Sequence, residues 1–135
     1  MAGVLPGYGH RGQGGDFQLL KMMVEEIERG DYTPGSTFRK ESELYVYEKF
    51  RSVFGRVHSD RLLKSRLQIL SRKYKTFSEM MNKPGISWDM KKNVVYGNEK
   101  LLREKYKYRC RYGHYYGEKH FDLMCQVFES GVKFN

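Results

Sequence analysis

The strongest constraint on this chain is an apolar stripe in and just after residues 61–77, which read RLLKSRLQILSRKYKTF. Large apolar side chains recur there at alternating steps of four and three residues, at Leu63, Leu67, Leu70, Tyr74, Phe77 and Met81. This spacing places them on one face of an α-helix. Because Ser59 can serve as an N-cap and Lys83-Pro84-Gly85 as a stop, the pattern predicts a long helix over residues 59–82 with one face in the core.

The opposite face of this predicted helix is polar and cationic. It carries side chains of the kinds that hydrogen-bond to base edges and phosphates: Arg61, Lys64, Ser65, Gln68, Arg72 and Lys75. Residues 56–75 hold seven cations and one acid, a net charge of +6, whereas residues 16–31 hold two cations and five acids, a net charge of −3. This polarisation favours a surface that meets DNA phosphates. A solvated helix face without a partner is the alternative interpretation.

Helical patterns also account for most of the remaining chain. Asp16 can cap a helix that stops at Gly30, and a second helix over residues 39–54 stops at Gly55. Further helices are predicted over residues 98–109 and 118–129, whereas periodicity leaves MKKNVVYG at residues 90–97 undecided. We therefore expect an all-α domain over residues 16–130, preceded by a flexible glycine-rich arm over residues 1–15 and followed by a tail over residues 131–135.

Composition narrows the class of partner. The 135 residues include 25 Lys and Arg against 16 Asp and Glu, and the net charge of +9 suits a nucleic acid or an anionic membrane. A helix that binds a membrane surface must expose its apolar stripe to the lipid. In this chain the apolar stripe is needed to complete the core. Without a long apolar run or a signal-peptide pattern at the start, and with two cysteines expected as reduced thiols, the chain is predicted to be soluble and intracellular.

A second basic tract, KLLREKYKYRCRYGHYYGEK at residues 100–119, interleaves cations with tyrosines. Tyrosines among cations can stack on bases or hydrogen-bond to phosphates. Alternatively, Leu101, Leu102 and Tyr106 pack against the long helix while the cations remain in water. We favour the packing interpretation and keep phosphate contacts as a secondary role.

Residue types that bind metals or act in catalysis occur in the sequence, but not in the arrangements typical of metal sites or active sites. Zinc accepts the residue types of Cys110, His114, His120 and Cys125, yet their spacing is not that of a standard finger. A buried free thiol on the apolar side of the last predicted helix explains Cys125 without metal. The sequence contains no nucleophile-elbow set and no GxxxxGK[ST] loop. We therefore predict no metal, no cofactor and no enzymatic activity.

Several short pieces, taken in order, resemble the plant Myb/SANT-like DNA-binding domain family, which includes transposon-derived members. These pieces are Arg29-Gly30-Asp31, TFRK at 37–40, EKF at 48–50, KSRLQILSRKY at 64–74, GISWD at 85–89 and FDLMCQVF at 121–128. Their order and spacing carry the resemblance, which spans most of the chain.

The resemblance implies a three-helix, helix-turn-helix bundle with a C-terminal helical extension, whose third helix enters the major groove. It also implies a nuclear DNA-binding domain of a transcription regulator or domesticated transposon protein, with double-stranded DNA as partner and no membrane or small-molecule substrate. Lys64, Ser65, Gln68, Arg72 and Lys75 would face the groove. The family usually has a basic residue at the position of Arg66, beside the core; we also consider Arg66 as an ion-pair partner of Glu48 or Glu26.

The tryptophans typical of Myb helices are absent from the first two predicted helices. We expect Phe17, Tyr47 and Phe50 to fill that volume, and Trp88 to fill the groove between the long helix and the C-terminal extension. The absence favours an alternative function, a SANT-like module that binds chromatin or regulatory proteins.

Overall fold

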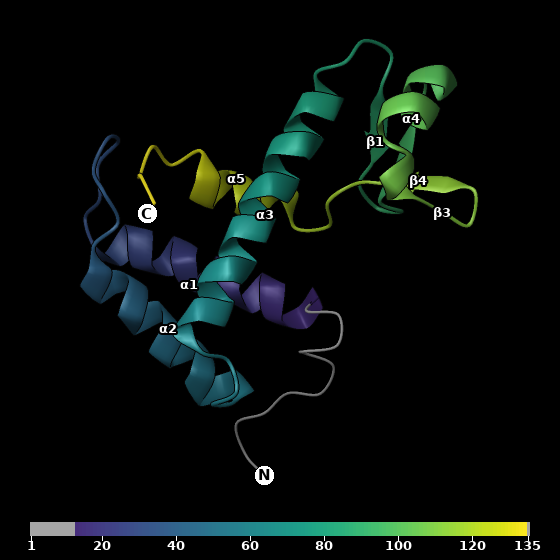
Figure 1. Cartoon of the computed structure of the whole chain (residues 1–135). Coiled ribbons are helices and arrows are strands. Elements are labelled where there is room, and N and C mark those ends of the chain that lie inside the picture. Colours follow the sequence, from purple (N-terminus) through teal and green to yellow (C-terminus); the bar gives the residue numbers. More distant parts are fainter. Residues whose placement is uncertain (1–12, 135) are drawn as a thin grey trace. The chain divides into compact units, whose positions relative to one another are not determined.

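The computed structural model describes residues 13–134, with side chains described from residue 15 onward (Figure 1). The predicted arm therefore lies outside the described residues as far as residue 12, and Gln13 already belongs to the first helix. The chain forms two compact units. The helical unit comprises the described parts of residues 1–71 and 122–135, and the sheet unit comprises residues 72–121.

The helical unit contains the three helices expected of a helix-turn-helix domain. These are α1 (Gln13–Arg29), α2 (Lys40–Phe54) and the first half of α3 (Asp60–Met81), and most of α5 (Phe121–Phe128) also belongs to this unit. Residues at helical spacing line its core: Leu19, Leu20, Met23, Val46, Tyr47, Phe50, Leu63, Leu70, Met124 and Val127. Tyr47 and Phe50 are fully buried, and Phe17 is half-buried.

Local signals set most helix ends in this unit. Gly55 ends α2 with φ of 109° and donates its N–H to the Arg51 carbonyl, and the Ser59 hydroxyl accepts from the Leu62 N–H at 3.2 Å. The prediction for Asp16 is wrong, because α1 begins at Gln13 and Asp16 lies inside its first turn. Its carboxylate binds Arg66 rather than capping the helix.

The C-terminal segment is joined to the loop between α1 and α2. Thr37 and Lys133 form a parallel bridge, and the N–H groups of Gly35 and Phe38 donate to the carbonyls of Gly131 and Lys133, each at 2.8 Å. Pro34-Gly35 forms the predicted turn, with Gly35 at a φ of 94°. The loop and the segment thus belong to one hydrogen-bonded structure.

The sheet unit contains a structure that the all-α prediction missed. Four short strands, β1 (Ser87–Asp89), β2 (Val94–Tyr96), β3 (Cys110–Arg111) and β4 (His114–Tyr116), form an antiparallel sheet in the order β1-β2-β4-β3. The predicted helix over residues 98–109 is only α4 (Glu99–Lys105), capped by Asn98 and followed by a 3-10 turn at Lys107–Arg109. The last helix begins at Phe121 rather than residue 118.

The end of α3 and the sheet share the core of this unit. Phe77 and Met80 of α3 pack with Val95, Leu102 and Tyr106, which confirms that the basic tract anchors itself on the long helix. Trp88 makes edge contacts with Phe77 at 4.9 Å and with Phe121, the first residue of α5, at 6.0 Å between ring centroids. This confirms the predicted position of the tryptophan.

Candidate nucleic-acid interface

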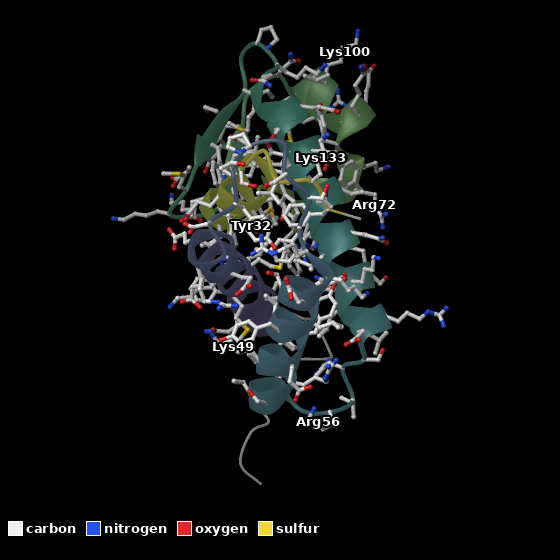
Figure 2. All side chains as sticks on the ribbon, turned by 90° about the vertical axis from the view of Figure 1, so that its left-hand side faces the viewer. Tyr32, Lys49, Arg56, Arg72, Lys100 and Lys133 are labelled. Carbon is white, nitrogen blue, oxygen red and sulfur yellow. The ribbon has the colours of Figure 1, made fainter. Side chains whose placement is uncertain are left out.

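The polar face of α3 is open along its length. Arg61, Ser65, Gln68, Arg72 and Lys75 are exposed and Lys64 is half-buried. Figure 2 shows the Arg72 side chain extending outward from α3. Within residues 15–134, none of these six side chains takes part in a salt bridge or hydrogen bond. The four cations among them therefore have no carboxylate that competes with a phosphate.

Neighbouring cations are already paired within the fold. Arg56 binds Glu48 at 2.6 Å, and Arg51 binds both Asp60 at 2.6 Å and Glu48 at 3.2 Å. Hydrogen bonds from Arg56 and Arg51 lower the pKa of the Glu48 carboxyl. These bridges tie α2 to the first residue of α3 and to the turn before it, so Arg56 belongs to the scaffold around the candidate interface.

Arg66 is held by a buried acid. Its guanidinium donates to both carboxylate oxygens of Asp16, from Nε at 2.7 Å and from a terminal nitrogen at 2.5 Å. Arg66 thus forms an ion pair, which was one of the two interpretations of this residue. Its partner is Asp16, so the expected partners, Glu48 and Glu26, were wrong. Glu26 instead binds Arg29 in the same two-pronged manner, at 2.8 and 2.9 Å.

Positive charge is concentrated in the sheet unit. Residues 72–121 carry 13 Lys and Arg against 5 Asp and Glu, a net charge of +8. The rest of the chain carries 12 against 11, a net charge of +1. The sheet unit therefore attracts polyanions far more strongly than the helical unit.

Sequence patterns missed two exposed apolar side chains near the start of α3. Val57 and Leu62 are 79% and 56% exposed, and Leu62 lies outside the apolar stripe. Apolar groups beside a recognition helix can contact thymine methyls. Between them in sequence, His58 packs edge-on against Phe50 at 5.5 Å, and burial lowers the pKa of its imidazole.

The residues that suggested zinc do not form a ligand cluster. Among residues 15–134, no group of three or more His, Cys, Asp or Glu side chains lies close enough to hold a metal ion. Cys110 and Cys125 are free and partly buried. Burial, together with Glu129 and Asp122, raises the pKa of the Cys125 thiol to about 11. The described helices also include none with the length and apolarity to span a membrane.

Three helices in helix-turn-helix order, the third of them cationic and exposed, are typical of DNA-binding domains. The model of the Myb/SANT-like DNA-binding domain family matches residues 14–104, and the chain belongs to this family. Membership supports a DNA-binding role, and the family is one of DNA-binding domains rather than of enzymes. Searches of curated proteins and of solved structures returned no match.

Proposed function

We propose that this domain binds double-stranded DNA by docking α3 in the major groove, and that it acts in the nucleus as part of a transcription regulator or domesticated transposon protein. The observation that carries the proposal is the open face of α3. Its cations Arg61, Lys64, Arg72 and Lys75 form no salt bridge with any residue that the structure describes. The nearby Arg56 and Arg66 are paired with carboxylates.

The side chains on this face divide by chemistry. The cations neutralise phosphates and supply most of the affinity, because each contact releases counterions. Ser65 and Gln68 lie between Lys64 and Arg72, where an amide and a hydroxyl can hydrogen-bond to base edges. Any sequence preference therefore depends on the middle of α3.

The test is a titration of the protein onto duplex DNA at several salt concentrations. We expect the logarithm of the association constant to fall linearly with that of salt, with a slope of about −0.9 per phosphate contact. Reversing the charge of Lys64, Arg72 and Lys75 together should abolish binding. The control reverses Lys40, Lys49 and Lys133, which are exposed cations of the helical unit, and should retain most of the affinity. Equal loss in both triple variants would contradict docking by α3.

A protein-binding function is the second candidate, and one observation favours it. The nearly neutral helical unit exposes Leu44 and Tyr45 on α2, and Leu44 lines a surface hollow with residues 37–41. A regulatory protein with an apolar segment would fit this surface better than DNA would. A partner retained at high salt by the wild type and lost in Leu44→Asp, with no duplex binding at low salt, would put this function first.

A further inference from the structure

The hairpin formed by β3 and β4 has an unusual tip. Arg111 pairs with His114 across a two-residue turn made by Tyr112 and Gly113, which have φ of 53° and 78°. Two positive φ values define the tight turn in which asparagine and glycine are the preferred residues. A tyrosine with a left-handed backbone is less stable at this position than asparagine or glycine would be.

The Tyr112 side chain adds little to the described part of the fold that would offset this cost. The Tyr112 side chain is 93% exposed, and among residues 15–134 it takes part in no hydrogen bond, ion pair or ring contact. A strained residue whose side chain is almost fully exposed is a reason to look for a function outside the folded chain.

The surroundings of the turn point to an anionic partner. In a hairpin, residues that pair across strands or lie two apart in one strand share a face. Arg111, His114 and Tyr116 therefore lie on one face, and the Arg111 guanidinium is 5.7 Å from the Tyr116 ring centroid. Tyr115 lies on the other face and packs against the core. Figure 1 shows the hairpin ending in a loop at the edge of the sheet.

Charge strengthens this indication. The sheet unit carries a net charge of +8, and the preceding exposed residues Lys105, Lys107 and Tyr108 continue the pattern of cations beside an open aromatic ring. Arg109 is the exception, because it is buried and binds Glu118 at 2.7 Å, which fixes the base of the hairpin. The match to the family model ends at residue 104, so the hairpin lies outside it.

We propose that the tip of the β3–β4 hairpin, with Arg111, Tyr112 and His114, is a second DNA contact that grips the sugar–phosphate backbone of a duplex. This inference rests on the proposed function. Arg111 would pair with a phosphate, and the Tyr112 hydroxyl would donate to a phosphate oxygen while its ring covers a sugar. Such contacts add affinity without sequence information.

The first test replaces Tyr112 with the residue that its backbone prefers. Tyr112→Asn should leave the melting temperature unchanged or raise it, because asparagine tolerates the left-handed conformation. The dissociation constant for duplex DNA should nevertheless rise about fivefold, the order expected for losing one hydrogen bond to the backbone. A purely structural role predicts a higher melting temperature with an unchanged dissociation constant, and that result would overturn the proposal.

The second test measures the charge contact. Arg111→Gln should lower the steepness of the salt dependence by about 0.9, the value for one lost phosphate contact. Lys133→Gln is the matched control, since it removes the same charge from an exposed position in the helical unit and should leave the steepness unchanged. Equal effects of the two variants would mean that Arg111 acts only through the net charge of the protein, and that result would overturn the proposal.

The outcomes separate this inference from the proposed function. If the wild type binds no duplex at low salt, the proposed function fails and the hairpin contact fails with it. If the wild type binds duplex and both hairpin variants match it, only the hairpin contact fails. A weakening confined to single-stranded nucleic acid would mean that Tyr112 stacks on unpaired bases, which also overturns the duplex contact.

Discussion

The helical unit and the sheet unit use charged residues in opposite ways. In the helical unit, acids nearly balance cations, and its salt bridges include the partly buried pairs Asp16–Arg66 and Glu26–Arg29. In the sheet unit, one such pair, Arg109–Glu118, is buried, and most other cations are exposed. The helical unit thus uses much of its charge to hold its helices, with Arg61 and Lys64 on α3 as exceptions, whereas the sheet unit leaves most of its cations exposed.

This difference shows that a count of cations overstates the surface open to DNA. Seven cations lie within residues 56–75, but Arg56 and Arg66 are bound to carboxylates. A phosphate that competes for Arg66 would have to leave Asp16 buried and unpaired, which is costly. Whether a cation can contact DNA therefore depends on whether a carboxylate of the fold already binds it.

The largest expected effect is a loss of stability confined to the sheet unit. Gly97 has a φ of 99°, and a Cβ there would collide with the Gly85 carbonyl oxygen. Gly97→Ala should destabilise this unit by about 3 kcal/mol, because backbone strain and a steric clash add. Fluorescence of Trp88, the only tryptophan, reports its thermal unfolding.

The control for this variant is Gly113→Ala, which has a φ of 78° and open space around the added Cβ. It should cost about 1 kcal/mol from strain alone. Equal melting temperatures for the two variants would show that the contact between residues 85 and 97 is unimportant.

The next effect concerns the helical unit. Asp16→Asn leaves Arg66 without its carboxylate and should lower the free energy of unfolding by about 2 kcal/mol. Denaturant titration measures this change. Glu41→Gln removes an exposed acid from α2 and should change stability little. Similar losses in both variants would contradict the structural role of the Asp16–Arg66 pair.

A smaller effect appears at acid pH. Burial opposes ionisation of Glu26, but hydrogen bonds from Arg29 and Ser42 outweigh it and lower the pKa of this carboxyl below 4.5. Because the folded-state pKa is the lower one, the stabilisation is present above pH 4.5 and is lost as the pH falls through the folded-state value. Stability measured from pH 6 to 3 should show this loss, reduced in Glu26→Gln. An unchanged pH profile in that variant would contradict the assignment.

The regular helices were predictable because their signals are local and repeated. The apolar stripe of α3 persists over a helix of 22 residues. Gly55 ends the preceding helix, and Ser59 and Pro84 lie just before and just after α3. The same periodicity placed Arg61, Ser65, Gln68, Arg72 and Lys75 on an exposed face.

The sheet was not predictable, because its strands contain only two or three residues each. Such runs are too short for alternation to appear, and the hairpin turn begins with Tyr112 instead of a typical turn residue. The pair between Asp16 and Arg66 was also missed, because 50 residues separate its partners in the sequence. Local patterns carry no information about such contacts.

The central claim is that the α3 cations without a salt bridge among the described residues bind DNA, and that cations held by carboxylates do not. Its most direct test compares the salt dependence of duplex affinity in Arg72→Gln and Arg56→Gln, which remove one charge each from exposed positions. The account predicts that the steepness falls by about 0.9 for Arg72→Gln and stays at the wild-type value for Arg56→Gln. An equal decrease in both variants, or a decrease for Arg56→Gln alone, would contradict it.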